Sequence, residues 1–536
     1  MMRTALRATR ESIRIAPSAT FSPKGSAALR SDATAPGRPS AARTSPVDQA
    51  RASSGGFSTT LALALMLLLG LIVRLLFINA DGFKNDVSTF ESWSLTLAEH
   101  PLRQFFAKAG FADYPPRYFF VLWFVGHAYK LLVHNDPTYG LLRIAVKLPG
   151  IVMDLVDSAL IYIIVRRFAS VAWGFAAAAA FAFNPAIIFI SAYWGQVDSV
   201  AAGLTLGSLL LLLDADRHTG RAATLSIVGA WLLLAYSILI KPPAIVVAPL
   251  YLAYVFATDD MASRVRRAVA TGIGVVASFG LAYLAALAFN PTYSPVAQFA
   301  WLLGRYAYAS GVYPYNSVNA FNLYVMAVNH FWQADSNLIP NWTIAGHTFG
   351  LPLYDWGIGL FGAAVLLVVS RYVQRRDSPA LLEAAMILSL GYFVLSTRMH
   401  ERYIFNAVLL ATPLVFFRKR YLYATVILSL TLLLNLIYSF DYLNVVNDPV
   451  AGVDPTDLMP FVSRPSAIFN VATFFYLGYV YLGAGSDALQ GFDLGALLVR
   501  AGSRVRRWFA PLEGTAWMRP RDWVLAGSLA IASFVL

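Results

Sequence analysis

The 536-residue sequence contains no cysteine and little charge. Without cysteine, disulfides, thiolate metal ligands and a thiol nucleophile are all excluded. Charged residues make up 13% of the chain, whereas 58% of its residues are apolar or aromatic, and soluble domains carry about 25% charge. The apolar residues gather in repeated runs close to the ~20 residues that cross a bilayer. The sequence therefore predicts an all-α polytopic membrane protein with no soluble domain large enough to work alone.

The first 55 residues lack such runs and are rich in Ala, Ser, Pro and Arg, with nine basic residues against three acidic ones. This composition faintly resembles an organelle transit peptide, but a disordered basic cytosolic tail or an over-extended gene start is the plainer interpretation. We expect three parts: this tail (1–55), a membrane module that carries the chemistry (56–420), and additional C-terminal transmembrane helices (421–536).

The net charge of +12 is read as membrane topology rather than as a sign of nucleic-acid binding. Lys and Arg are enriched in cytosolic loops, so the N-terminus is expected in the cytosol. The apolar segment 118–133 is short and contains His127 and Lys130. If it lies at the outer interface instead of crossing, six basic clusters all face inside. This gives about 13 spans, at 61–78, 143–165, 171–190, 197–213, 222–240, 243–258, 269–289, 352–370, 378–396, 403–417, 421–440, 466–483 and 522–536.

This predicted topology leaves two long outer segments, 80–142 and 290–351, and two short outer turns, 193–199 and 396–403. Irregular polar backbone must lie in water or be buried in protein. We therefore expect these four pieces to converge on one outward-facing cavity, where the chemistry takes place.

The first outer segment opens with a candidate catalytic carboxylate. After Asp86, the residues Val87, Phe90, Ser94 and Leu97 recur at three- and four-residue spacing, which predicts a short interfacial helix with one apolar face. Asp86 stands at its start, where the helix dipole favours a negative charge. Helix capping and catalysis are both consistent with this position.

Two further motifs combine aromatic and polar side chains. In Asp113-Tyr114-Pro-Pro the two prolines predict an extended turn into the next helix, and Asp113 is assigned to that turn. In the turn 193–199, Trp194, Gln196 and Asp198 exceed what a tight turn requires. Such groups are usual in sugar-binding sites, although aromatic residues are also common at membrane interfaces.

Basic residues on the outer side are candidates for binding a phosphate. Lys241 precedes two prolines at a membrane edge and is either a snorkelling anchor or a point charge for phosphate. Arg305 in the second long segment is a weaker candidate.

The outer turn 396–403 has four ionisable residues in five positions, on the side that should be poor in positive charge. Arg398, His400 and Arg402 match what an anionic phosphate requires. The alternative is a salt-bridged loop cap in which Glu401 neutralises one arginine.

Two other acidic patterns are interpreted differently. The Asp-Ala-Asp sequence at 214–216 has the form of a metal-binding motif of sugar transferases, but the threading places it inside, away from the other candidates. Asp154 and Asp157 lie within a span and are functional candidates for that reason. Pairing with Arg143 or Lys147 is the alternative.

The order of these motifs resembles that of the GT-C membrane glycosyltransferases over residues 60–420. The similarity is to the lipid-linked-oligosaccharide α-glucosyltransferases and to bacterial polyprenyl-phosphate-sugar-dependent mannosyl- and other glycosyltransferases. It implies that Asp86 is the general base and that the donor is a polyprenyl-phosphate-linked sugar. The sequence departs from the glucosyltransferase pattern where Arg402 replaces a lysine and Asp198 an asparagine.

The resemblance implies transfer to an acceptor hydroxyl on a glycan, lipid or protein at the outer (periplasmic or lumenal) face, by an inverting single displacement. The donor phosphate is assigned to His400, Arg398, Arg402, Lys241 and Arg305, and further substrate contacts to Tyr114, Trp194, Gln196, Asp198 and Glu401. No metal is required, because the phosphate leaves already anionic. The chain is expected in a bacterial inner membrane or in the endoplasmic reticulum. A transporter or flippase that binds the same lipid without chemistry is the alternative, and a structural partner is a third.

Overall fold

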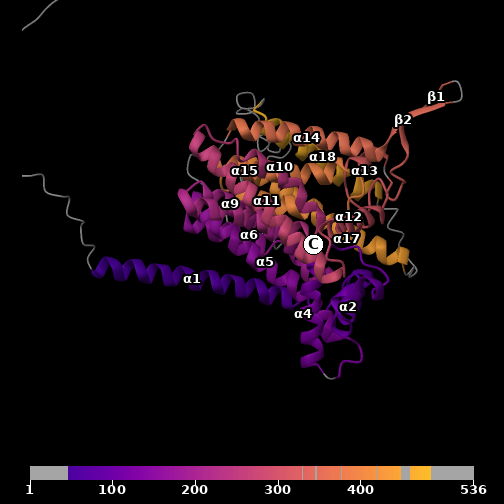
Figure 1. Cartoon of the computed structure of the whole chain (residues 1–536), viewed down its shortest axis with the longest axis horizontal. Helices are drawn as coiled ribbons and strands as arrows, with labels where there is room; N and C mark the ends of the chain where they lie inside the picture. The colour runs from indigo at the N-terminus through magenta and orange to yellow at the C-terminus, as the bar shows by residue number, and fades with distance from the viewer. Residues whose placement is uncertain are drawn as a thin grey trace, which may run out of the picture. The chain divides into compact units, whose positions relative to one another are not determined.

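The computed structural model describes residues 46–133, 135–328, 330–344, 347–375, 377–418, 420–447 and 459–483. The chain divides into two units, Met1–Ser58 and the part that begins at Thr59. The second unit is a bundle of helices with one short hairpin (Figure 1). The predicted span 522–536 and the basic cluster at 500–521 lie outside the described residues.

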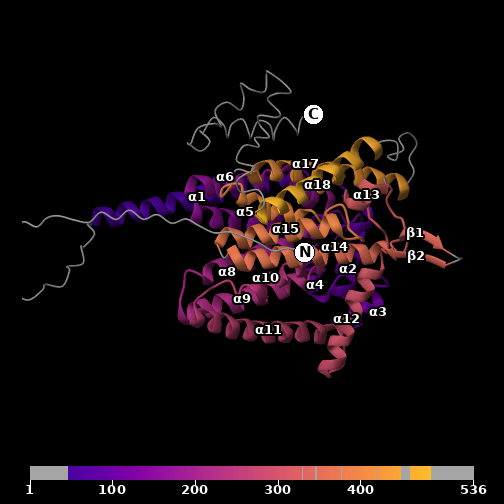
Figure 2. The same cartoon turned by 90° about the horizontal axis from the view of Figure 1, so that it is seen from above.

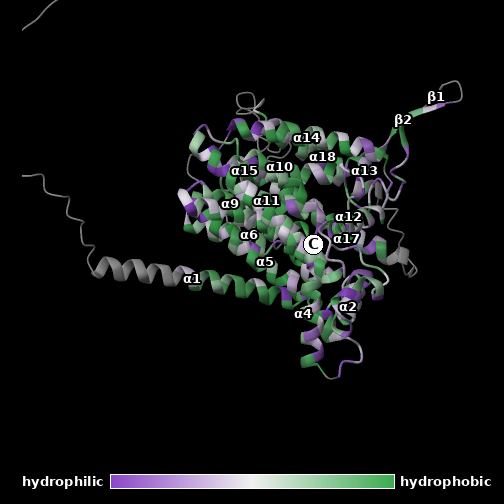
Figure 3. Cartoon of the chain, viewed as in Figure 1, coloured by the Kyte–Doolittle hydropathy of each residue, from purple (hydrophilic) through white to green (hydrophobic). Residues whose placement is uncertain are grey.

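The helices follow the apolar runs of the sequence, and hydrophobic residues extend along them (Figure 3). Their bounds are α1 Pro46–Leu75, α2 Lys84–Glu99, η1 Leu102–Gln104, α3 Phe105–Lys108, α4 Pro116–Leu132, α5 Gly140–Phe168, α6 Val171–Ala182, α7 Pro185–Ile188, the π-helical η2 Phe189–Trp194, α8 Asp198–Ala215, α9 Gly220–Ile238, η3 Pro242–Val247, α10 Ala248–Ala253, α11 Met261–Phe289, α12 Pro295–Gly311, α13 Leu323–Val328, α14 Leu353–Arg375, α15 Ser378–Leu395, α16 Phe405–Leu414, α17 Arg420–Asn447 and α18 Met459–Tyr481.

Seven of the described helices are long and apolar enough to cross a membrane: α5, α8, α9, α11, α14, α17 and α18. The pair formed by 171–182 and 185–194, bent by 49°, is an eighth candidate. Shorter apolar helices lie at 59–75, 242–253, 379–395 and 405–414. Each of the twelve predicted spans within the described residues thus overlaps an apolar helix, and the chain is a multi-pass membrane protein. The total of thirteen crossings stays a prediction.

Salt bridges join the C-terminal ends of α5 and α8 to each other and the end of α8 to the first turns of α11. Arg167 at the end of α5 pairs with Asp214 at the end of α8, at 3.0 Å. Asp216 pairs with Arg267 in the first turns of α11, at 2.8 Å. The two aspartates of the 214–216 motif are therefore paired with arginines, at the C-terminal end of α8.

A buried ion pair ties α1 to α5. Arg74 Nε donates to Asp154 Oδ2 at 2.8 Å, and both side chains are fully buried. Ser191 also donates to this oxygen, at 2.6 Å. The partner of Asp154 is thus neither Arg143, which pairs with Asp81, nor Lys147.

The first long predicted outer segment folds into α2 and α4, which pack on each other. α2 buries Val87, Phe90, Ser94 and Leu97, as its spacing predicts, and it also buries Trp93. α4 begins at Pro116, directly after the proline turn. The placement of these helices at a membrane interface stays a prediction.

The second long segment contains the one departure from an all-α fold among the described residues. Strand β1 (Leu338–Ile344) pairs antiparallel with β2 (His347–Pro352). This hairpin projects from the helices in both views (Figures 1 and 2). Nothing in the sequence analysis predicted it.

Candidate active site

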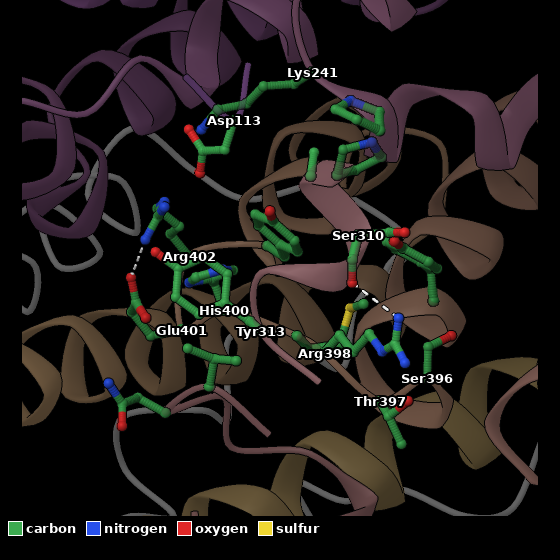
Figure 4. Close-up of a pocket in the computed structure, with 18 of the residues that line it drawn as sticks. Asp113, Lys241, Ser310, Tyr313, Ser396, Thr397, Arg398, His400, Glu401 and Arg402 are labelled. Carbon is green, nitrogen blue, oxygen red and sulfur yellow. Dashed lines mark hydrogen bonds and ion pairs between the residues drawn. The ribbon is translucent and has the colours of Figure 1, made fainter. Parts of the chain in front are cut away.

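The four predicted outer pieces meet at one cavity of about 970 Å³. Asp86 and Tyr114 enter from the first long segment, Trp194 from the first short turn, Tyr313 from the second long segment and His400 from the second short turn. Lys241 also lines this cavity, and Figure 4 shows part of its polar lining. The predicted convergence is confirmed.

Asp86 is held by one carboxylate oxygen and open at the other. The indole Nε1 of Trp194 donates to its Oδ2 at 2.7 Å, and Nε2 of Gln196 donates to the same oxygen at 2.5 Å. No described residue donates to Oδ1. α2 begins at Lys84 without a side-chain cap, so Asp86 is not the helix cap that its position also allowed. Its carboxylate instead lies at the cavity wall with a fixed orientation.

Two glycines allow the chain segments around Asp86 to approach closely. The backbone N–H of Phe83 donates to the carbonyl of Trp194 at 3.0 Å. Gly82 has φ +72°, and a Cβ there would stand 2.5 Å from the same carbonyl. Gly195 has φ +94°, and its Cβ would stand 2.8 Å from a methyl of Val87. Any larger residue at these glycines would push the two segments apart.

Two cations of the site, Lys241 and Arg402, are already paired with carboxylates. Lys241 Nζ lies 2.8 Å from Asp198 Oδ1, and both residues are buried. Arg402 Nε lies 3.6 Å from the other Asp198 oxygen, and its Nη1 donates to Glu401 at 2.5 Å. Lys241 is therefore not a snorkelling anchor. Arg402 Nε has no hydrogen-bond partner among the described residues, and a lysine has three donors, so both cations keep capacity for an anion.

Arg398 has a different environment from Arg402. It donates to Asp335 Oδ2 at 2.6 Å and to the carbonyl of Ser310 at 2.9 Å, and it lies 4.2 Å from the centre of the Tyr354 ring. These contacts tie the 396–403 turn to the second long segment. The loop-cap alternative named Glu401 as the carboxylate that neutralises one arginine, and that arginine is Arg402. Arg398 pairs with Asp335 instead, and its side chain also lines the cavity.

His400 is a neutral imidazole at physiological pH. Burial, with the charges of Arg402 and Lys241, holds its pKa well below the usual range. Its ring lies 4.9 Å from that of Tyr313 and 5.1 Å from that of Tyr403. His400 is therefore suited to hydrogen bonding with a substrate rather than to charge neutralisation.

Asp113 is part of the cavity as well as of the proline turn to which it was assigned. Its backbone enters the proline turn as predicted, but its side chain lines the cavity beside Lys241 (Figure 4). Burial raises its pKa to about 6, against the opposing effect of Arg402. The site thus contains a second carboxyl group that titrates near neutral pH.

Two other predicted residues, Tyr114 and Arg305, differ in whether they belong to the site. The hydroxyl of Tyr114 lies 3.5 Å from Oε1 of Gln196, and Lys241 Nζ lies 5.5 Å from the centre of its ring. Tyr114 therefore belongs to the site. Arg305 stacks on Phe106 at 5.1 Å and does not line the cavity.

Several lining residues were missed. One face of α14 forms an apolar wall of the cavity, and its residues are Gly357, Ile358, Phe361, Gly362, Val365 and Leu366. They recur at helical spacing, but the signal was hidden because the whole segment is apolar. Ile358 and Leu366 remain 54% and 71% exposed, so the cavity is open along this side.

The helix assigned to the C-terminal part also borders the site. Leu443 of α17 lines the cavity, and the ring of Phe440 lies 5.5 Å from that of Trp194. No motif had suggested a contribution from this helix. Among the described residues, no group of three His, Cys, Asp or Glu side chains is arranged to hold a metal ion.

Comparison with known proteins gives structural likeness alone. No family model matches the sequence, and no curated protein matches it. ArnT from Cupriavidus metallidurans bound to undecaprenyl phosphate superposes with a TM-score of 0.43 at 14% identity, over 86% of this chain and 82% of that one. The apo state of ArnT gives 0.41 at 15%, over 80% and 77%.

The archaeal oligosaccharyltransferase AglB from Archaeoglobus fulgidus, in complex with an inhibitory peptide and a dolichol-phosphate, gives a TM-score of 0.40 at 11% identity. The match covers 85% of this chain and 60% of AglB. With TM-scores below 0.5 and identities of 15% or less, these likenesses assign neither an activity nor residue roles to this chain.

Proposed function

We propose that this protein is a membrane glycosyltransferase that moves a sugar from a polyprenyl-phosphate-linked donor to an acceptor hydroxyl, with Asp86 as the general base. One observation carries the proposal. Asp86 has one oxygen fixed by Trp194 and Gln196 and the other without a donor among the described residues, in a cavity that also contains the cations Lys241 and Arg402 and an apolar wall. Base, phosphate partner and lipid wall are the three components that such a transfer needs.

In the reaction, Asp86 Oδ1 accepts the proton of the acceptor hydroxyl as its oxygen attacks the anomeric carbon. The bond from that carbon to the phosphate oxygen breaks, and polyprenyl phosphate leaves with the bonding electron pair. A single displacement of this kind inverts the anomeric configuration. A positioned base contributes about 10²–10⁴ in rate, and the two hydrogen bonds to Oδ2 supply the positioning.

Lys241 and Arg402 are the proposed partners of the donor phosphate. Charge that develops on the leaving phosphate is stabilised by cations already in place. In the structure each is neutralised by Asp198 or Glu401, so the phosphate would share these cations with carboxylates. Because the leaving group is already anionic, we expect transfer without a metal ion.

The apolar face of α14 is the proposed wall for the polyprenyl chain. Isoprenoid carbon gains about 25 cal/mol for each Å² of apolar surface removed from water. A cavity that is open beside Ile358 and Leu366 would let the chain extend into the bilayer while the phosphate stays near Lys241.

The test is a transfer assay with purified protein and a panel of polyprenyl-phosphate sugars, with and without EDTA. We expect product from at least one donor, equally in EDTA. Asp86→Asn keeps the size of the side chain, so the variant should fold while kcat falls about 10²–10⁴-fold.

Asp81→Asn is the matched control, because Asp81 lies in the same loop, is exposed and, among the described residues, forms a salt bridge only with Arg143. It should keep near-normal turnover. Full activity in folded Asp86→Asn would refute the base assignment. Tight donor binding without transfer under any condition would favour a lipid transporter instead.

A further inference from the structure

Lys147 is a buried lysine whose ammonium group contacts backbone carbonyls. Its side chain is fully buried in α5. Nζ lies 2.6 Å from the carbonyl oxygen of Ala80, 3.2 Å from those of Ile78 and Ala192, and 3.3 Å from that of Tyr193. No carboxylate of a described residue forms a salt bridge with it. Three N–H groups are thus shared among four carbonyls from two separate segments.

Two of the four carbonyls come from the last turn of η2, and the other two come from the turn that follows α1. Ile78 and Ala80 follow the end of α1 at Leu75, and Ala192 and Tyr193 belong to the last turn of η2. The last carbonyls of a helix lack intrahelical partners and form the negative end of its dipole. A buried ammonium at this point therefore satisfies carbonyls that would otherwise be unpaired, and these carbonyls compensate its charge.

The two segments that Lys147 joins lead directly to the two sides of the Asp86 site. One continues from Ala80 to Asp86 within six residues, and the other continues from Tyr193 to Trp194 and Gln196, the donors to Asp86. The segments meet again where the Phe83 N–H donates to the carbonyl of Trp194. Lys147 thus joins the two segments that orient the Asp86 carboxylate, although it does not line the cavity itself.

We propose that Lys147 is a positioning residue for transfer: its ammonium clamps the α1–α2 loop to the end of η2 and so fixes Asp86 against Trp194 and Gln196. This inference rests on the proposed function only in that Asp86 is the base. The Arg74–Asp154 pair joins α1 to α5 through other atoms, so α1 stays attached to α5 without Lys147. The loss should be local to the loop.

The test uses Lys147→Met, which keeps the length of the side chain and removes the charge, together with Lys147→Arg. Lys130→Met is the control, because Lys130 is an exposed lysine on α4 that pairs with Glu99 at the end of α2. Each substitution is combined with a single cysteine for spin labelling, possible because the chain has none. Lys84→Cys reports on the start of α2 and Thr219→Cys on a distant exposed loop.

In Lys147→Met we expect a mobile label at residue 84, an unchanged label at residue 219 and elution as a folded protein. Turnover is measured without labels or added cysteines. We expect kcat to fall at least tenfold while the donor KM changes less than about threefold, because Lys241 and Arg402 are untouched. Lys147→Arg should retain more turnover than Lys147→Met, and Lys130→Met should match the parent protein.

The two arms separate the clamp from the proposed function. An immobile label at residue 84 in Lys147→Met would overturn the inference, whatever the turnover. A mobile label with full kcat would support the clamp and refute Asp86 as the base. If the parent protein transferred no sugar, the label would still decide whether Lys147 holds the loop.

Discussion

At the scale of single residues, Asp113 makes the site sensitive to pH. Burial raises the pKa of this carboxyl to about 6, so it is neutral below pH 6 and anionic above it. The charged groups that face it are Arg402, Asp86 and Lys241. Burial, with the charges of Arg402 and Lys241, holds the pKa of His400 well below its usual value.

We therefore predict that donor affinity weakens as pH rises through about 6. The phosphodiester of the donor keeps one negative charge throughout, while ionised Asp113 adds another negative charge beside Lys241 and Arg402, which already pair with Asp198 and Glu401. A repulsion of about 1 kcal/mol, typical of charges in partly screened sites, corresponds to a three- to tenfold rise in the donor dissociation constant between pH 5 and 7.5. The Asp113→Asn variant should bind the donor with little pH dependence when its dissociation constant is measured over the same pH range. A parallel pH dependence in that variant would assign the effect to another group.

The sequence predicted the site at the level of residue type but not of side-chain direction. Helical spacing correctly placed Asp86 at the start of an amphipathic helix. It could not show that Trp194, about a hundred positions away, donates to this carboxylate. The prolines after Asp113 fixed its backbone and left its side chain free to face the cavity. The neutral state of His400 results from burial, which a sequence motif does not contain.

At the scale of elements, the face of α14 that lines the cavity offers a test of lipid-chain binding. Gly362 lies on this face, and a Cβ there would meet no atom within 4 Å. Gly362→Leu should therefore fold and place four carbons in the space proposed for the polyprenyl chain. We predict that the donor KM rises at least fivefold for a long-chain donor and changes little for a short-chain analogue, in the transfer assay.

Gly359→Leu is the matched control on the same helix. A Cβ at Gly359 also meets nothing within 4 Å, but this residue does not line the cavity. The two variants thus carry the same change in helix propensity and differ only in the face that is altered. Equal donor KM values for the two variants would contradict binding of the lipid chain against α14.

The elements that the sequence predicted well are those for which hydropathy decides. Twelve predicted spans overlap apolar helices because burying a backbone in lipid requires internal hydrogen bonds, which a helix provides. The hairpin of β1 and β2 was not predicted, since no such requirement acts on the long segment between α12 and α14. The cavity face of α14 was also hidden, because lipid-facing and cavity-facing residues are both apolar there.

At the scale of the whole molecule, α8 and α15 each have the site near one end and a salt bridge to an arginine near the other. α8 begins at Asp198, in the site, and ends beside the pair of Asp214 with Arg167. α15 runs the other way, from the pair of Glu383 with Arg418 to the 396–403 turn. The charge pattern alone gave this alternation, because basic loops resist crossing the membrane.

The last prediction is that the two ends face opposite sides of the membrane, with the site outside. Single cysteines at Lys84 and Thr219 stand at exposed positions beside the site and in the loop between α8 and α9, respectively. An impermeant maleimide added to intact cells or sealed vesicles of known orientation should label residue 84 from the outer side. Residue 219 should react only after the membrane is opened. The physical reason is that the loop from Arg217 to Arg221 carries two arginines and a histidine within five positions, which favours retention in the cytosol. Labelling of residue 219 from outside would invert the chain, and the donor would then have to reach the cavity from the cytosolic leaflet.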